Sequence, residues 1–294
     1  MRRSRAGLRW HEGRQPCAAH RAVTQKPAAR GARFPVPLEQ TLPRAAPQGK
    51  QMLRPQAPLL HAARDAAQQH RPSGLGLDSA AVRQALVQRL RAEFHCHDAV
   101  CRAMLAVPRH HFVDSALATQ AYEDTSLPIG LGQTISKPSV VARMLSLLHE
   151  GENARRSGRL GRVLEIGTGC GYQAALLGQM STRVLSIERL KPLHDRARAN
   201  LGEQRAGHIR LVYGDGRLGH PPNAPYDSIV AAAGGDDLPA AWLEQLADGG
   251  RLVAPMQAAS RAGQVLLVVD RQGSEFRRST HEPVHFVPLK SGIE

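Results

Sequence analysis

Three closely spaced glycines are the residues of this 294-residue chain best suited to hold a small ligand. They follow a short apolar run in the stretch RVLEIGTGCGY, residues 162–172, which reads as a buried parallel strand. Gly167, Gly169 and Gly171 then provide a turn in which no Cβ blocks the approach of a ligand. Helical spacing resumes over residues 174–180, so the free N–H groups of a helix N-terminus would face the same ligand.

The spacing of these glycines favours S-adenosylmethionine over a dinucleotide. A dinucleotide fingerprint, G-x-G-x-x-G, would place its third glycine at position 172, where the chain has Tyr172. The pattern here begins with Glu165, whose carboxylate suits the cationic amino-acid end of S-adenosylmethionine and would repel a pyrophosphate. A second strand over 183–187 ends in Glu188, which could accept both ribose hydroxyls, a feature of both cofactor classes. Glycines alone could form a structural turn, but Glu165 and Glu188 in register favour a cofactor site.

A second candidate site is the stretch LPIGLGQTISKP, residues 127–138. It places two glycines, two prolines, two hydroxyls and an amide directly before a helix expected over residues 139–149. A segment of this composition is too polar for a core and too constrained for a linker, so we expect a binding loop.

Both stretches resemble the protein-L-isoaspartate O-methyltransferase family, whose enzymes repair aged Asp and Asn sites. The family pattern L-P-I-G-x-G-Q-T-I-S-x-P-x-x-V-A-R-M is present from Leu127, and V-L-E-I-G-T-G-x-G-Y-Q follows from Val163. The later matches are HIRLVYGDG at 208–216, YDSIVAAA at 226–233, DGGRLVAPM at 248–256 and VHFVPL at 284–289. The resemblance covers about residues 80–290. The chain departs from the family at 234–237, Gly-Gly-Asp-Asp, where an Ala-Pro or Pro-Pro pair is common. The resemblance therefore does not predict peptide contacts for these four residues.

The resemblance implies an enzyme that transfers the methyl group of S-adenosylmethionine to the free α-carboxylate of L-isoaspartyl residues in damaged proteins and peptides, and to D-aspartyl residues. It implies Ser136 as the active-site serine, with Thr134 beside it, orienting the substrate carboxylate through hydrogen bonds. The other implied substrate residues are Gln133, Ile135, Ala232 and Ala233. The implied cofactor residues are Glu165, Gly167, Thr168, Gly169, Gly171, Glu188, Asp215 and Gly216.

The chemistry of this transfer makes few demands on the protein. A carboxylate is already an ionised nucleophile at neutral pH, so the transfer requires alignment and desolvation more than a general base. The methyl ester would then collapse to a succinimide, which hydrolyses partly to normal aspartate. Ser136 could instead be an N-cap of the following helix, although Pro138 already stands where a proline belongs in a first helical turn.

Alternating strands and helices predict an α/β fold with a doubly wound, mostly parallel sheet, the Rossmann-like architecture of class I S-adenosylmethionine-dependent methyltransferases. The expected strands are 162–166, 183–188, 209–213, 226–232 and 250–255, and the expected helices between them are near 172–180, 191–203 and 239–247. Two earlier helices, 78–95 and 98–106, should form an N-terminal cap. The runs 265–270 and 284–287 have no helix-length connection and should pair as an antiparallel edge.

The composition of the chain changes near residue 77. Of its 39 Lys and Arg and 25 Asp and Glu, residues 1–77 hold 14 and three, so 11 of the 14 net positive charges lie there. Nine prolines and few large aliphatics predict a disordered basic extension, either a solvated tail or a weak electrostatic arm for nucleic acid, acidic protein or anionic membrane. Its Arg-rich, acid-poor composition is also similar to a mitochondrial transit peptide, although its prolines disfavour an amphipathic helix. Residues 78–294 are the expected methyltransferase domain, with the helical cap and substrate loop over 78–150 and the cofactor-binding sheet over 151–294.

Other features limit what the protein can be. Cys17, Cys96, Cys101 and Cys170 contain no C-x-x-C pair, so we expect reduced thiols and a cytoplasmic location. The His and Cys residues over 95–111 match no usual zinc spacing, and no metal is expected. No apolar stretch is long enough for a signal peptide or a membrane span. The expected protein is a monomer that acts on isoaspartyl-containing proteins and peptides, without membrane contact.

Two other functions remain open. One is an S-adenosylmethionine-dependent methyltransferase of nucleic acid or a small molecule, which the basic extension would favour. Against it, Ala231, Ala232 and Ala233 stand where many nucleic-acid enzymes carry N/D-P-P-Y. The other is a non-enzymatic binding protein built on a methyltransferase body, which the filled cofactor positions disfavour.

Overall fold

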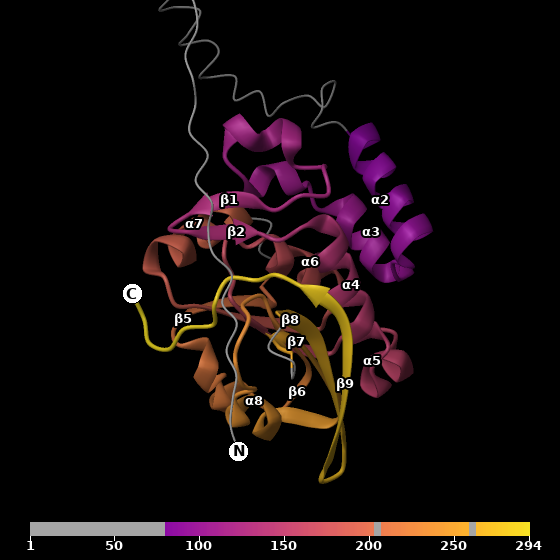
Figure 1. Cartoon of the computed structure of the whole chain (residues 1–294), viewed down its shortest axis with the longest axis vertical. Coiled ribbons are helices and arrows are strands. Elements are labelled where there is room, and N and C mark those ends of the chain that lie inside the picture. The colour runs from indigo at the N-terminus through magenta and orange to yellow at the C-terminus, as the bar shows by residue number, and fades with distance from the viewer. Residues whose placement is uncertain (1–79, 203–206, 259–262) are drawn as a thin grey trace, which may run out of the picture. The chain divides into compact units, whose positions relative to one another are not determined.

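A seven-stranded sheet forms the centre of the fold in this computed structural model (Figure 1). In spatial order its strands are β5 (Ile209–Tyr213), β4 (Arg183–Glu188), β3 (Arg162–Ile166), β6 (Tyr226–Ala231), β7 (Leu246–Gln257), β8 (Gln264–Gln272) and β9 (Glu275–Val284). The structure describes residues 80–202, 207–258 and 263–294, and the predicted extension over residues 1–77 lies outside this part of the chain.

The strands from β5 to β7 are parallel, and β8 and β9 continue the sheet antiparallel. The central strands β3, β4 and β6 are short apolar runs that are almost fully buried, as expected for parallel strands covered on both faces. The predicted doubly wound, mostly parallel sheet with an antiparallel edge is therefore confirmed.

The prediction for the outer edge of the sheet was wrong about which residues form the last strand. The sequence analysis expected residues 284–287 as the last strand, whereas β9 ends at Val284. The sequence of β9, EFRRSTHEPV, is polar and none of its residues is fully buried, so pairing along β8 forms this strand rather than an apolar face. Residues after Val284 leave the sheet, and Pro288 forms an isolated bridge with Gly234.

The described helices are α2 (Ala80–Phe94), α3 (Asp98–Ala106), α4 (Pro138–His149), α5 (Glu152–Ser157), α6 (Tyr172–Met180), α7 (Lys191–Leu201) and α8 (Ala240–Glu244). Local sequence explains the ends of α3, because the His97 side chain accepts a hydrogen bond from the Ala99 N–H and Pro108 follows the last turn. α8 is shorter than predicted because β7 already begins at Leu246. None of the described helices is both long and apolar enough to cross a membrane.

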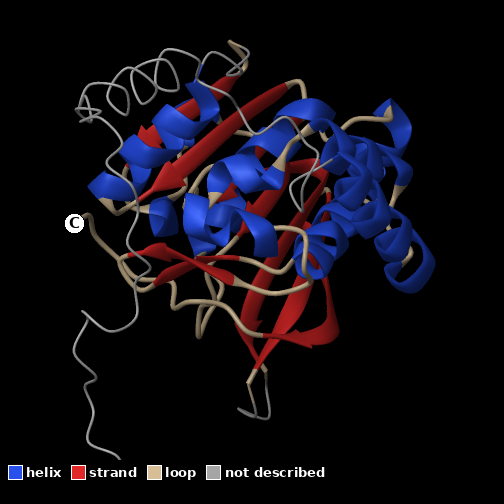
Figure 2. Ribbon diagram, turned by 90° about the horizontal axis from the view of Figure 1, so that it is seen from above, coloured by secondary structure: helices blue, strands red, loops and turns tan. Residues whose placement is uncertain are grey.

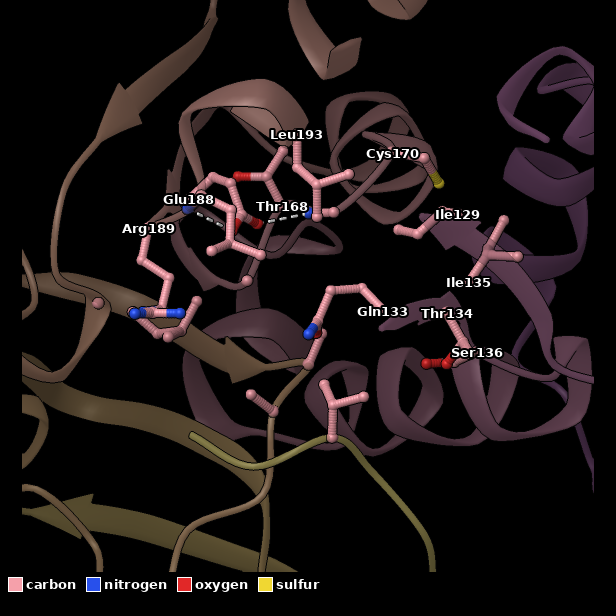
Figure 3. Close-up of a pocket in the computed structure, with 18 of the residues that line it drawn as sticks. Ile129, Gln133, Thr134, Ile135, Ser136, Thr168, Cys170, Glu188, Arg189 and Leu193 are labelled. Atoms are coloured by element: carbon pink, nitrogen blue, oxygen red, sulfur yellow. Dashed lines mark hydrogen bonds between the residues drawn. The ribbon is translucent and has the colours of Figure 1, made fainter. Parts of the chain in front are cut away.

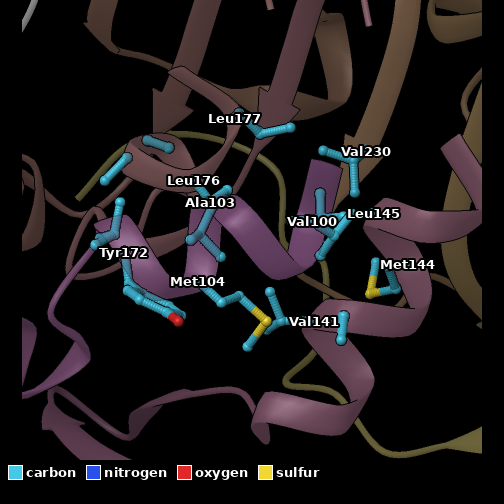
Figure 4. Close-up of a cluster of buried hydrophobic side chains, with 14 of the residues drawn as sticks. Val100, Ala103, Met104, Val141, Met144, Leu145, Tyr172, Leu176, Leu177 and Val230 are labelled. Carbon is cyan, nitrogen blue, oxygen red and sulfur yellow. The ribbon is translucent and has the colours of Figure 1, made fainter. Parts of the chain in front are cut away.

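Helices cover both faces of the sheet (Figure 2). Along β3 and β6, Val163 and Val230 belong to one core layer, which includes residues of α3, α4 and α6 (Figure 4). The neighbouring Leu164 and Ile229 point to the other layer, where Trp242 of α8 is fully buried. This alternation follows from the two-residue period of a strand, and each large apolar side chain buried in this way stabilises the fold by about 1.5–3 kcal/mol.

The strand order places a crevice at one end of the sheet. The chain leaves β3 through α6 and returns as β4 on one side, whereas β6 pairs with β3 on the other side. At such a switch point the connections diverge, and the space outside the carboxyl ends of the two strands is open to a ligand.

Candidate active site

A cavity of about 320 Å³ lies outside the carboxyl ends of β3 and β6 (Figure 3). One wall is a hairpin of β1 (Leu127–Gly130) and β2 (Gln133–Ile135), within the predicted binding loop. Figure 3 shows Ser136 on this wall and Glu188, at the end of β4, across the cavity. The sequence-predicted site residues that line the cavity are Gln133, Thr134, Ile135, Ser136, Gly167, Thr168, Gly169, Glu188, Gly216, Ala232 and Ala233.

The glycine turn after β3 brings backbone close to this cavity. Gly167 has a φ of +88°, a conformation that side chains disfavour. A Cβ on Gly169 would lie 3.2 Å from the Ile129 Cδ1 atom of the hairpin, so a larger residue would press the two walls apart. The Gly169 N–H donates to the Glu188 Oε2 atom over 2.8 Å, which ties the turn to the end of β4.

The Glu188 carboxylate is buried and held by the backbone on both oxygens. Besides the bond from Gly169, its Oε1 atom accepts the Leu190 N–H over 3.0 Å. Each carboxylate oxygen can accept a second hydrogen bond, so the group remains able to receive two ligand hydroxyls. The next residue, Arg189, also lines the cavity and forms an ion pair of 2.8 Å with Glu294.

Ser136 stands between the hairpin and α4 without acting as a cap. The N-cap position of α4 is Lys137, with no side-chain capping bond, and the Asp124 carboxylate instead accepts the Ser139 N–H over 2.8 Å and its hydroxyl over 2.7 Å. The Ser136 hydroxyl forms no hydrogen bond to another described residue, while its carbonyl oxygen accepts a bond from Arg109. The N-cap alternative for Ser136 is therefore wrong, and its hydroxyl remains available to a ligand.

Three predicted cofactor residues lie outside the lining of the cavity. Glu165 is fully buried beneath the glycine turn, where it accepts a hydrogen bond from the Ser186 hydroxyl, and burial raises its pKa to about 8. The Asp215 carboxylate accepts the Gly292 N–H over 2.6 Å. Gly171 starts α6 with a φ of +91°. Direct cofactor contacts of Glu165, Asp215 and Gly171 thus stay predictions.

The segment 287–290 forms one wall of the cavity, and it was not predicted from the sequence. This segment is attached to the end of β6 by two backbone bonds, from the Gly234 N–H to the Val287 carbonyl over 2.8 Å and from the Leu289 N–H to the Gly234 carbonyl over 2.7 Å. The motif V-H-F-V-P-L gave a usable signal, because Pro288 cannot donate to a sheet ladder and argues against a strand there. Arg189, Leu193 and Tyr172 were also missed as lining residues.

Three of the histidines and cysteines over 95–111 have structural surroundings: His97, Cys96 and Cys101. His97 caps α3, and its ring stacks on His149 with centroids 4.3 Å apart. Cys96 and Cys101 are buried free thiols, and burial raises the pKa of Cys96. Across residues 80–202, 207–258 and 263–294, no group of three or more His, Cys, Asp or Glu residues is arranged to hold a metal ion.

Comparison with known proteins agrees with this arrangement. The family model for protein-L-isoaspartate(D-aspartate) O-methyltransferase matches residues 81–294. A protein-L-isoaspartate O-methyltransferase of Methylibium petroleiphilum is 57% identical over 271 residues, 92% of this chain and 98% of that protein. A solved protein-L-isoaspartate O-methyltransferase structure superposes with a TM-score of 0.63 at 26% identity, covering 72% of this chain and 67% of its own. A Plasmodium falciparum structure in complex with S-adenosyl-L-homocysteine shares the fold, with a TM-score of 0.61 at 22% identity over 71% of this chain and 98% of its own. The chain belongs to the protein-L-isoaspartate(D-aspartate) O-methyltransferase family.

Proposed function

We propose that the protein is a repair methyltransferase that transfers the methyl group of S-adenosylmethionine to the free α-carboxylate of L-isoaspartyl residues, and to D-aspartyl residues, in damaged proteins and peptides. The observation that carries this proposal is one cavity shared by two sets of residues. The glycine turn and Glu188 suit the cofactor, and Thr134 and Ser136, at the end of the hairpin, supply two hydroxyl groups to the same cavity. Family membership over residues 81–294 supports the same activity.

The cofactor half of the cavity fits S-adenosylmethionine. The Glu188 carboxylate is positioned by two backbone N–H groups and has accepting capacity left for the ribose hydroxyls. Gly167 and Gly169 allow the ligand to approach the backbone closely. Ala232, the first residue after β6, lines the cavity with a small side chain. The relative of the same fold from Plasmodium falciparum was solved with S-adenosyl-L-homocysteine, the molecule left after methyl transfer.

The substrate half fits a carboxylate nucleophile. An oxygen of the substrate carboxylate forms a bond to the methyl carbon while the carbon–sulfur bond breaks, and the electron pair of that bond returns to sulfur as a neutral thioether. The hydroxyls of Ser136 and Thr134 donate hydrogen bonds that orient the carboxylate, so alignment and exclusion of water supply the rate increase. The substrate carboxylate is already ionised, so no proton has to be removed from it and the reaction needs no general base.

Methyl transfer to three matched acceptors tests the proposal. The purified protein is incubated with radiolabelled S-adenosylmethionine and a peptide that contains isoaspartate, the same peptide with aspartate, or RNA. We expect base-labile label on the isoaspartyl peptide alone. Transfer to RNA, or equal transfer to both peptides, would support another methyltransferase class instead.

The role of Ser136 is tested by its alanine variant. Ser136→Ala should lower kcat/KM for the isoaspartyl peptide by about tenfold or more, which corresponds to about 1.4 kcal/mol, because one donor to the carboxylate is lost. Affinity for S-adenosyl-L-homocysteine should stay unchanged, since Ser136 lies on the opposite wall from Glu188. Wild-type kinetics in this variant would transfer the role to Thr134 or Gln133.

We also infer that the protein acts as a monomer in the cytoplasm, with residues 78–150 supplying the substrate wall and 151–294 the cofactor wall. The lining residues of the cavity fall between Ile129 and Lys290 of a single chain, so the proposed chemistry does not require a second copy. Light scattering after size exclusion, at the concentration of the assay, tests it; a dimer with full activity would contradict the inference.

A further inference from the structure

Arg109 is an unusual residue beneath the substrate wall. It begins a short 3-10 helix, η2 (Arg109–Phe112), and its side chain is fully buried. Its Nη2 atom donates to the Ser136 carbonyl oxygen over 2.8 Å, and its guanidinium carbon lies 5.0 Å from the centre of the Tyr172 ring. Within the described part of the chain, Nε and Nη1 have no hydrogen-bond partner. Most of the hydrogen-bonding capacity of this buried cation is therefore unused.

Among the described residues, the charge of Arg109 has no ion-pair partner either. Burial lowers its pKa, but a guanidinium remains protonated in proteins, so a full positive charge stays below the hairpin. Among the described residues Asp124 is a carboxylate that interacts electrostatically with Arg109, and its two oxygens are already bound to Ser139 at the start of α4. A buried charge without a partner is costly, and such a charge strongly favours any anion that binds next to it.

We propose that Arg109 is a positioning residue for the substrate carboxylate, and that its charge makes the cavity selective for a free carboxylate over a neutral group of the same shape. This inference rests on the proposed function. The guanidinium acts through the peptide group of Ser136: it fixes the serine by the carbonyl bond, and its field reaches the carboxylate that the Ser136 hydroxyl binds. Arg109 itself lies outside the cavity lining, but its side chain is fully buried, so solvent screens its charge less than it screens that of a surface arginine.

The other cations of the cavity are less suited to this role. Arg189 is already paired with Glu294, and Figure 3 shows it across the cavity from Ser136. Lys290 is exposed, so solvent screens its charge. The sulfonium of the cofactor is absent once S-adenosyl-L-homocysteine occupies the site, which allows the contribution of Arg109 to be measured alone.

The test compares two peptides that differ only in charge. Calorimetry measures binding of an isoaspartyl peptide, and of its analogue with an α-carboxamide, to the complex with S-adenosyl-L-homocysteine. In the wild type the acid should bind at least about tenfold more tightly than the amide. In Arg109→Met, which keeps the volume of the side chain, this preference should fall below about threefold, while affinity for S-adenosyl-L-homocysteine is retained.

A matched control separates charge from attachment of the hairpin. Arg196 donates to the Ile129 carbonyl of the same hairpin over 2.9 Å and, like Arg109, lies outside the cavity lining, but its side chain is only half-buried, so solvent screens its charge more. Arg196→Met should weaken the acid and the amide by the same factor. If Arg109→Met also weakens both equally and leaves the preference unchanged, Arg109 is only structural and the inference is wrong. If the wild type itself shows no preference for the acid, the proposed substrate site fails instead.

A measurement on the wild type covers the case in which Arg109→Met does not fold. The peptide carries a ¹³C label in its α-carboxyl group, and its titration is followed by NMR in the complex with S-adenosyl-L-homocysteine. An adjacent buried cation should lower the pKa of the bound carboxyl by about one unit or more relative to the free peptide. Desolvation alone would raise this pKa, so an unchanged or raised value would refute the role of Arg109.

Discussion

Glu188 offers the most direct test of the cofactor site, through the substitution Glu188→Gln. The two side chains have the same shape, but a side-chain amide has one accepting oxygen where the carboxylate has two. Both oxygens of Glu188 accept backbone bonds, from Gly169 over 2.8 Å and from Leu190 over 3.0 Å. Whichever way the amide turns, its NH₂ group meets one of these N–H groups and that bond is lost.

The expected magnitude follows from the number and kind of these bonds. A hydrogen bond to a charged acceptor contributes about 1.5–3 kcal/mol, so loss of one such bond should lower the free energy of unfolding by about 2 kcal/mol. The cofactor loses the negative charge that accepts its ribose hydroxyls, which should weaken binding by about 2–3 kcal/mol, or about 30- to 150-fold in Kd.

Calorimetric titration with S-adenosyl-L-homocysteine measures this loss, with thermal unfolding recorded in parallel. Asp195→Asn is the matched control, because Asp195 is an exposed acid on α7 that pairs with Lys191 and lies outside the cavity lining. It should leave Kd within about twofold of the wild type. A Kd for Glu188→Gln within about threefold of the wild type would refute the assignment of Glu188 to the ribose.

Three further predictions concern other parts of the chain. In Gly234→Ala the new Cβ would overlap the side-chain amide of Gln264 and displace it from the Phe286 N–H, whose hydrogen bond it accepts. The free energy of unfolding should therefore fall by about 1–3 kcal/mol in urea titrations, and an unchanged midpoint would contradict this. Burial lowers the pKa of His149 from an ordinary 6.5 to about 4, so the folded state disfavours protonation of this imidazole. The contribution of neutral His149 to stability is therefore complete above pH 6.5 and is lost as the pH falls toward 4. Between pH 7 and pH 5 the wild type should lose about 2 kcal/mol more than His149→Gln does, and parallel losses in denaturant titrations would rule this out. Removal of residues 1–76 should leave kcat/KM for a short isoaspartyl peptide within about twofold of the full-length value, because the residues that line the cavity fall between 129 and 290. Loss of activity at low salt would show that the basic extension contributes to catalysis or peptide binding.

The central sheet could be predicted from sequence because its strands are defined by local apolar runs. Residues 162–166 and 183–188 were expected as strands, and β3 and β4 cover those residues. The outer strand β9 could not be predicted in the same way, since its polar residues become a strand only by pairing with β8. Pairing between distant segments leaves no periodic signal in either segment alone.

The same distinction between local signals and contacts between distant segments applies to the residues of the site. The types and spacing of Gly169 and Glu188 indicated one cofactor site, whereas Ser136 was assigned through the family resemblance of the loop that contains it. Arg109 gave no signal, because burial of an arginine depends on the hairpin and α6 folding over it. Glu165 was predicted as a cofactor residue, and its burial could not be foreseen from the strand itself, because it depends on the neighbouring Ser186 of β4 and on the helices that cover the sheet.

The wall formed by Val287–Lys290 has a consequence for how the protein is made. The cavity needs this segment as well as the hairpin that begins at Leu127, so it can be complete only after residue 290 has emerged from the ribosome. Chains are synthesised and begin to fold from the N-terminus, and a ligand stabilises only a state that can bind it. The first strands of the sheet are therefore synthesised before the cavity that will hold S-adenosylmethionine is complete.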